Sequence, residues 1–164
     1  MTHLVTTDED LVRAAFGRFP SGVAALCATI DGEPEGIVAS SFSVGVSLDP
    51  PLVLFSVRKA STTWPTLRGA ARIGVSILGE SHEAACRQIA SRGDRFSGLD
   101  IHTSEAGAVF IEQSPVWLEC SILSETPAGD HDIVVLQVAT LRIDEAAEPL
   151  VYHGSAFRQL AGAL

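Results

Sequence analysis

The sequence predicts a mainly β fold, a closed antiparallel barrel decorated with short helices. About six or seven apolar, strand-like runs follow one another at close spacing, with turn residues between them. Helices do not alternate regularly with these runs, as they would in a doubly wound parallel sheet. The chain has 164 residues, of which 46% are hydrophobic, so we expect one domain, residues 1–164, with its own core.

Strands are expected where short apolar runs lie between turn or breaker residues. Residues 31–34 (DGEP) indicate a hairpin turn after the first strand. Pro50 and Pro51 break the pattern after the second strand, because neither residue can donate to a ladder. Glycines bound a loop at 93–98, and a longer loop at 125–131 joins two long strands. The expected strands span residues 23–30, 36–46, 52–57, 72–78, 115–123, 133–143 and 150–153.

Helices are expected from capping residues and from the spacing of apolar residues. Thr7 can cap the first helix, which has acidic residues at its positive end and apolar residues four apart. Ser61, Thr62 and Thr63 can cap the second helix, in which Pro65 is tolerated only in or near the first turn. With their caps, the expected helices span residues 8–19, 61–68, 80–91 and 156–160.

The charge balance argues against several classes of partner. With 11 Lys and Arg against 20 Asp and Glu, the net charge is −9, which disfavours binding to nucleic acid and to anionic membrane surfaces. No apolar run approaches the roughly 20 residues of a membrane span. The first ten residues contain no Lys or Arg, so we expect no secretory or mitochondrial targeting signal.

The cysteines favour a reducing compartment. Cys27, Cys86 and Cys120 are odd in number and far apart, and no CxxC motif occurs. Cys27 and Cys120 lie in strand-like runs, where a buried thiol behaves as a small hydrophobic side chain. We expect all three thiols to be reduced and structural, and the protein to be cytoplasmic.

Several familiar motifs are absent from the sequence. No Gly-rich nucleotide loop of the GxGxxG or GxxxxGK[ST] type occurs, and no G-x-S-x-G elbow. His82 and Glu83 do not begin an H-E-x-x-H motif, because Cys86 occupies the position of the second histidine. No metal site is therefore expected.

Three polar clusters remain as candidate sites. Residues 39–43 place small serines in an apolar strand, which suits the edge of a flat heteroaromatic ring. Residues 58–63 put two cations before a hydroxyl-rich helix start, a setting that binds phosphate. Residues 129–131 form a turn that presents His131. Each cluster also has an ordinary structural interpretation, so the residues alone indicate only a barrel that could bind a phosphate-bearing aromatic ligand.

Further motifs surround these clusters, in an order that covers almost the whole chain. The segments are 16–23 (FGRFPSGV), 36–43 (GIVASSFS), 47–53 (SLDPPLV), 61–65 (STTWP), 72–78 (RIGVSIL), 94–98 (DRFSG), 117–120 (WLEC), 127–131 (PAGDH) and 149–152 (PLVY). In this order they resemble the flavin reductase family. Members of that family lack a Rossmann domain and supply reduced flavin to two-component monooxygenases.

The resemblance implies a fold, a reaction and an assembly. The implied fold is the FMN-binding split β-barrel, antiparallel and Greek-key-like, in a homodimer with flavin sites near the subunit interface. The implied activity is that of an NAD(P)H:flavin oxidoreductase, with hydride passing from nicotinamide C4 to flavin N5. FMN or FAD would be the flavin, NADH or NADPH the co-substrate, and a flavin-dependent monooxygenase the partner.

The resemblance also implies roles for individual residues. His131 would lie beside the flavin ring where the nicotinamide stacks, which makes it the candidate catalytic residue. Residues 39–43 would lie along the isoalloxazine ring, residues 56–62 would hold the ribityl phosphate, and the loop around Arg95 would flank the site. The candidate cofactor-binding residues are Ala39, Ser40, Ser41, Phe42, Ser43, Ser47, Ser56, Arg58, Lys59, Ser61, Thr62, Arg95 and Phe96.

Departures from the family pattern leave some points open. The sequence differs from the usual family pattern at Asp132, Gln137 and residues 155–157. These differences bear on the affinity for the cofactor and on which dinucleotide is preferred. Two other functions stay open. An FMN-dependent oxidase of the same barrel class would act on its own substrate, and a carrier or sensor would bind flavin or haem without turnover.

Overall fold

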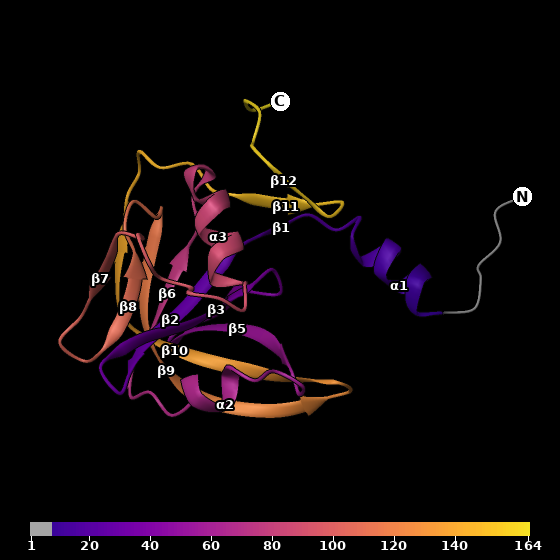
Figure 1. The fold of residues 1–164 in the computed structure, drawn as a ribbon. Coiled ribbons are helices and arrows are strands. Elements are labelled where there is room, and N and C mark those ends of the chain that lie inside the picture. The colour runs from indigo at the N-terminus through magenta and orange to yellow at the C-terminus, as the bar shows by residue number, and fades with distance from the viewer. Residues whose placement is uncertain (1–7) are drawn as a thin grey trace, which may run out of the picture.

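The computed structural model describes residues 8–164 and consists mainly of antiparallel strands (Figure 1). The strands are β1 (Ser21–Gly22), β2 (Ala24–Ile30), β3 (Glu33–Ala39), β4 (Ser43–Leu48), β5 (Pro51–Arg58), β6 (Ile73–Ile77), β7 (Ile101–Thr103), β8 (Ala108–Ile111), β9 (Val116–Ala128), β10 (His131–Ile143), β11 (Val151–His153) and β12 (Ala156–Arg158). The helices are α1 (Glu9–Phe16), α2 (Trp64–Leu67), the 3₁₀ helix η1 (Glu80–His82) and α3 (Glu83–Ile89).

The strands form two antiparallel sheets. The larger sheet has the order β4-β5-β10-β9-β6-β2-β8-β7, with β3 paired to β2, and the smaller sheet has the order β1-β11-β12. Figure 1 shows α3 next to the small sheet and α1 extending away from the barrel. The prediction of a mainly β, antiparallel fold with helical decorations is confirmed.

Strand β2 separates two hydrophobic clusters, because it is buried on both faces. Ala24 and Leu26 belong to the cluster inside the barrel, whose largest fully buried side chain is Phe55. Ala25 and Cys27 belong to the second cluster, which packs between β2, α3 and the small sheet. Burial on both faces explains why residues 24–28 of β2 are all apolar and do not alternate with polar residues.

The first helix is shorter than predicted. α1 ends at Phe16, because the chain then tightens: the N–H groups of Arg18 and Phe19 donate to carbonyls only three residues back. Its cap is Asp8, whose carboxylate accepts a hydrogen bond from the backbone N–H of Leu11 at 2.9 Å. The expected cap, Thr7, lies outside the described residues.

The helices expected at 61–68 and 80–91 are both present, and both are shorter than expected. The helix expected at 80–91 divides into η1 and α3, and the one expected at 61–68 is the single turn α2. Thr63 occupies the N-cap position of α2 without a capping bond from its side chain. The N–H of Trp64, the first helical residue, donates instead to Oγ of Ser61 at 3.1 Å.

The loop expected at 125–131 is instead the end of a long hairpin. β9 continues to Ala128 and β10 starts at His131, and these two residues face each other across the ladder. Only Gly129, with φ of +65°, and Asp130 remain in the turn. The hairpin end extends past the core, so its residues are polar and exposed and resemble a loop in composition.

Three further predictions were wrong: one strand, one segment expected to contain no strand, and one helix. The strand expected at 36–46 divides into β3 and β4, because residues 40–42 leave the ladder. Strands β7 and β8 lie in a segment for which we expected none. The segment expected as a helix at 156–160 contains β12, which pairs with β11 around a turn at Gly154 and Ser155, both with positive φ. A two-residue turn of this kind favours a hairpin over a helix.

The cysteines are free and buried, as expected for structural thiols. Burial raises the pKa of Cys27 and of Cys120 to about 12, and it also raises the pKa of Cys86. Such thiols carry little thiolate and react poorly. Across residues 8–164, no cluster of three or more His, Cys, Asp or Glu side chains could hold a metal ion. Within the same range, no helix is long and apolar enough to cross a membrane.

Candidate functional site

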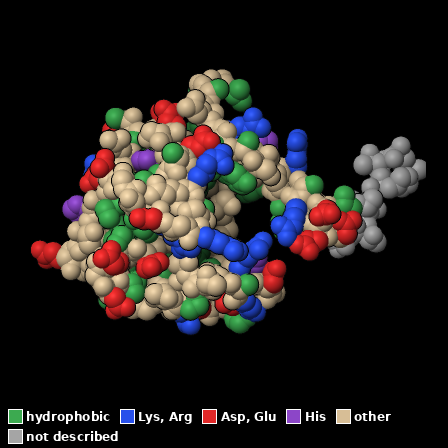
Figure 2. Space-filling model, viewed as in Figure 1, with side chains coloured by type: hydrophobic (Ala, Val, Ile, Leu, Met, Phe, Trp, Pro, Cys, Tyr) green, Lys and Arg blue, Asp and Glu red, His purple; other side chains and the backbone are tan. Residues whose placement is uncertain are grey.

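A cleft of about 1030 Å³ brings together the three polar clusters of the sequence. It lies between β3, β5, the segment before α2 and the loop that follows α3. Figure 2 shows Lys and Arg side chains beside a hollow on the side of the molecule that faces α1. The predicted residues that line the cleft are Ala39, Ser40, Ser41, Ser56, Arg58, Ser61, Thr62, Arg95 and His131.

Ser41 joins β5 to the segment that follows β3. Its Oγ donates a hydrogen bond to the carbonyl of Ser56 at 3.0 Å and accepts one from the N–H of Ser56 at 3.1 Å. The side chain therefore replaces a ladder partner where β3 and β5 do not pair directly. Ala39 and Ser40 stand beside this bridge and leave one wall of the cleft lined by small side chains.

The cations after β5 have different surroundings. Lys59 donates from Nζ to the carbonyl of Gly129 at 2.8 Å, and its backbone N–H donates to the carbonyl of Asp130 at 3.0 Å. These bonds tie Lys59 to the β9–β10 turn. Arg58 lines the cleft and forms no ion pair with another described residue. Its guanidinium is the donor on β5 that can meet an anionic ligand.

Arg95 is held by three hydrogen bonds. Its Nε donates to the carbonyl of Ser91 at 2.8 Å, and its Nη1 donates to the carbonyl of Gly36 at 3.0 Å and to Oγ1 of Thr63 at 2.7 Å. These bonds connect the loop after α3 to β3 and to the start of α2. Arg95 therefore orders one wall of the cleft in addition to lending it positive charge.

Gly36 is required by close packing behind the cleft. A Cβ at this position would lie 2.5 Å from Sγ of Cys27 and 3.0 Å from Cζ of Phe96. β2 and the loop after α3 can therefore approach β3 only because this residue has no side chain.

His131 enters the cleft from the start of β10. Its Nδ1 lies 2.7 Å from Oδ1 of Asp130, and its side chain is 34% exposed, against 94% for Asp130. This hydrogen bond, with the charge of the imidazole, lowers the pKa of Asp130. The pairing restrains the ring and leaves Nε2 as the nitrogen free to meet a ligand.

Some candidate residues do not line this cleft. Phe42 packs against the barrel core. Ser43 and Ser47 pair with Leu54 and Leu52 in the β4–β5 ladder. Those that lie outside the cleft are Phe42, Ser43, Ser47, Lys59 and Phe96, of which Phe96 lines an adjoining cavity.

Sequence analysis did not identify Arg92, which lines the cleft and forms no ion pair with another described residue. It was passed over because it stands just outside the motif at 94–98. Its position three residues before Arg95, directly before the glycine-bounded loop at 93–98, is the signal that could have identified it.

The cleft fits a flat ligand that carries phosphate. Its volume is near the upper end of the roughly 300–1,000 Å³ usual for small-molecule sites. Ile37, Val38 and Ala39 of β3 supply apolar lining. None of the three guanidinium groups that line the cleft has a carboxylate partner among the described residues, and those of Arg58 and Arg92 form no ion pair or side-chain hydrogen bond with these residues that would hold them away from a ligand. Guanidinium groups in such surroundings bind phosphate oxygens well.

Comparison with known proteins agrees with this geometry. Residues 16–161 match the family model described as "Flavin reductase like domain". The chain is 36% identical to a flavin reductase of Pseudomonas putida over 148 residues, which cover 89% of this chain and 86% of the relative. It is 32% identical over 151 residues to the reductase subunit of a flavin-dependent monooxygenase of Mycobacterium tuberculosis, covering 90% of this chain and 80% of the relative.

Solved structures give the same result. The NADH:FAD oxidoreductase SgcE6 of Streptomyces globisporus C-1027 superposes with a TM-score of 0.89 and 34% identity, covering 99% of each chain. That protein has also been solved in complex with NAD and FAD fragments, with the same TM-score and with 98% of each chain covered. Since the family model and these relatives span nearly the whole chain, this protein belongs to the flavin reductase-like family.

Proposed function

We propose that the cleft holds FMN or FAD, and that the chain supplies reduced flavin to a separate monooxygenase component. The activity itself follows from family membership: the chain is an NAD(P)H-dependent flavin oxidoreductase. The observation that supports the site is that three polar clusters, far apart in sequence, line one cleft. When bound, the flavin supplies the hydride acceptor, N5 of its ring.

The two ends of the cleft suit the two ends of a flavin mononucleotide. The small residues Ala39, Ser40 and Ser41 leave room for a flat ring against β3. Arg58 and Thr62 place a guanidinium and a hydroxyl where the ribityl phosphate would lie. In this orientation the protein contributes binding, ring orientation and charge compensation.

We assign His131 to the positioning of the nicotinamide. It lines the cleft from the first residue of β10, where it pairs with Arg58 of β5, and Asp130 fixes its Nδ1. A ring held in this way can orient a second planar group without removing a proton from it. Hydride transfer between two stacked rings needs no strong general base, and their contact contributes a large part of the rate.

We also propose that the chain forms a homodimer. β4 exposes Val44, Val46 and Leu48, and the outer face of β10 exposes Leu141 and Ile143. α1 buries none of its side chains within the chain. Exposed apolar side chains on several elements are a feature of protein interfaces. Sedimentation at micromolar concentration should therefore give twice the mass of the chain, and a monomer would contradict the proposal.

The partner protein and the cellular location of this chain are inferred from its relatives and its composition. Relatives are reductase subunits of flavin-dependent monooxygenases, which supports a monooxygenase partner for this chain. Three free, buried cysteines suit the reducing cytoplasm. A net charge of −9 disfavours nucleic acid as a ligand.

NADH and NADPH oxidation with excess FMN, FAD or riboflavin tests the proposed function. Rapid turnover that depends on added flavin is the expected result. An oxidase would instead consume an organic substrate without nicotinamide, and a carrier would bind flavin without turnover. Either result would overturn the role of supplying reduced flavin.

A further inference from the structure

Lys59 is the only lysine in the chain, and it bonds to both residues of the β9–β10 turn. Its Nζ donates to the carbonyl of Gly129 at 2.8 Å, and its backbone N–H donates to the carbonyl of Asp130 at 3.0 Å. These two residues make up the whole turn, since β9 ends at Ala128 and β10 begins at His131. One residue therefore holds the two carbonyls that directly precede His131.

The end of this hairpin has few other attachments. Residues 126–130 are all exposed, so none of their side chains is anchored in the core. Besides the strand ladders and the bonds of Lys59, an ion pair connects the hairpin end to the rest of the described chain, with Nη2 of Arg68 3.0 Å from Oε2 of Glu125. Ladder bonds fix the register of the strands, whereas the position of an exposed turn depends on bonds made to the turn itself. The bonds of Lys59 therefore determine where the turn lies.

The position of His131 follows from the position of this turn. Its Nδ1 lies 2.7 Å from Oδ1 of Asp130, and Asp130 is itself a turn residue. A shift of the turn would therefore carry both groups with it. Across the ladder His131 pairs with Arg58, the residue directly before Lys59. The imidazole thus reaches the cleft from a turn whose carbonyls are held by the next residue along the chain.

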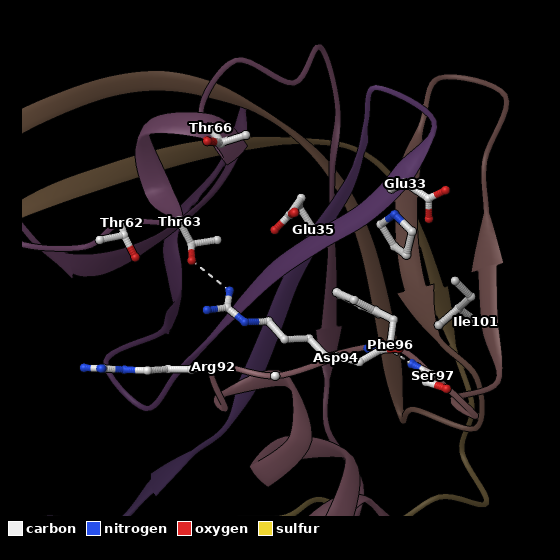
Figure 3. Close-up of a pocket in the computed structure, with 13 residues that line it drawn as sticks. Glu33, Glu35, Thr62, Thr63, Thr66, Arg92, Asp94, Phe96, Ser97 and Ile101 are labelled. Atoms are coloured by element: carbon white, nitrogen blue, oxygen red, sulfur yellow. Dashed lines mark hydrogen bonds between the residues drawn. The ribbon is translucent and has the colours of Figure 1, made fainter.

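The segment that carries Lys59, residues 58–63, is itself held at its far end. Figure 3 shows the guanidinium of Arg95 directed at Thr63, and its Nη1 donates to Oγ1 of that residue at 2.7 Å. Within the segment, the N–H of Ser61 donates to the carbonyl of Arg58 at 3.0 Å. The segment is therefore an ordered support from which Lys59 can hold the hairpin turn.

We propose that Lys59 is a positioning residue for the nicotinamide, because it holds the turn that places His131; this inference rests on the proposed function. Lys59 does not line the cleft, so it acts without touching the flavin. Loss of its side-chain bond would leave the backbone bond to Asp130 in place and free the turn in part. His131 would then occupy its position for a smaller fraction of the time, and the apparent affinity for NADH would fall with that fraction.

Stopped-flow reduction of the FMN-loaded full chain over a range of NADH concentrations tests this role. Lys59→Met keeps the length of the side chain and removes the donor. It should raise Kd for NADH about threefold to tenfold, as expected for one lost hydrogen bond, and leave Kd for FMN unchanged. Lys59→Arg should restore the wild-type value, because a guanidinium can donate to the same carbonyl. Arg68→Met is the matched control, since it removes the same charge and a different contact to the hairpin, at Glu125.

A double variant tests whether Lys59 acts through His131. In a His131→Ala background, Lys59→Met should have no further effect on Kd for NADH, because the imidazole that the lysine positions is absent. For the same reason the effect of Lys59→Met alone should not exceed the effect of His131→Ala.

Three results would overturn the inference. An unchanged Kd for NADH in Lys59→Met, while His131→Ala raises it, would show that the turn keeps its place without the lysine. An equal rise in Arg68→Met would assign the effect to lost charge or to a looser hairpin. Additive effects in the double variant would show that Lys59 acts on NADH directly. If His131→Ala itself leaves NADH binding unchanged, the role proposed for His131 fails, and this inference fails with it.

Discussion

Arg58 and Lys59 are adjacent cations, and replacing each by alanine should have different effects on flavin binding. Only Arg58 lines the cleft, whereas Nζ of Lys59 donates to the carbonyl of Gly129. Arg58→Ala should therefore weaken FMN binding much more than riboflavin binding. Lys59→Ala should leave the ratio of the two affinities unchanged, although it removes the same charge from the next residue.

The size of the effect follows from the surroundings of Arg58. Hydrogen bonds to charged groups contribute about 1.5–3 kcal/mol each. Arg58 is exposed, so solvent and salt screen its charge and the lower part of this range applies. We therefore expect Kd for FMN to rise by about tenfold in Arg58→Ala. For Lys59→Ala we expect a loss of about 0.5–1.5 kcal/mol in the free energy of unfolding, from one lost hydrogen bond.

Fluorescence titration of FMN and riboflavin against both variants, at two salt concentrations, is the assay. Added salt should reduce the preference for FMN in the wild type and change it less in Arg58→Ala, because the screened interaction is absent there. Equal losses of FMN and riboflavin affinity in Arg58→Ala would refute the phosphate role. A selective loss in Lys59→Ala would show that the hydrogen bond to Gly129 does not hold that side chain away from the ligand.

Three more predictions test the site and the fold. Ser41→Leu should abolish flavin binding, because the larger side chain fills the cleft. Ser41→Ala should lose only the two hydrogen bonds to Ser56, about 1–3 kcal/mol of unfolding free energy, and should still bind flavin. Equal flavin Kd values for the two variants would exclude Ser41 from the site. His131→Ala should raise the NAD(P)H KM, or lower kcat/KM, with little change in flavin Kd, and stopped-flow reduction at the wild-type rate would contradict this. Burial lowers the pKa of His82, so below about pH 6.5 the unfolded chain binds a proton that the folded chain does not. The free energy of unfolding should therefore fall as the pH drops below about 6.5. In His82→Gln this free energy should depend less steeply on pH.

The elements that could be predicted from sequence are those whose burial repeats over a few residues. β10 buries Val134, Leu136 and Val138 while intervening residues are less buried, so an alternating pattern was visible. Residues 24–28 of β2 are all apolar, because both faces of the strand are covered there. The cluster for which we propose phosphate binding was visible in the sequence, because its cations and hydroxyls lie within one short segment, 58–63.

Segments whose state depends on a distant partner were predicted poorly. The end of the β9–β10 hairpin carries no buried face of its own, so only its ladder pairing shows that it is a strand. β12 likewise is a strand only because it pairs with β11. Local composition does not encode such pairing, since register depends on how the whole sheet assembles.

The site was assembled by contacts that no local pattern contains. Arg95 reaches the carbonyl of Gly36, 59 residues away in sequence, and the hydroxyl of Thr63, 32 residues away. Lys59 and Arg58 look equivalent in the sequence, and only the position of the β9–β10 turn at Gly129 separates their roles. The chemistry of each side chain can therefore be predicted from the sequence alone. The set of groups that share one cavity cannot, because it depends on sheet register and on the path of the loops, which form only when the chain folds.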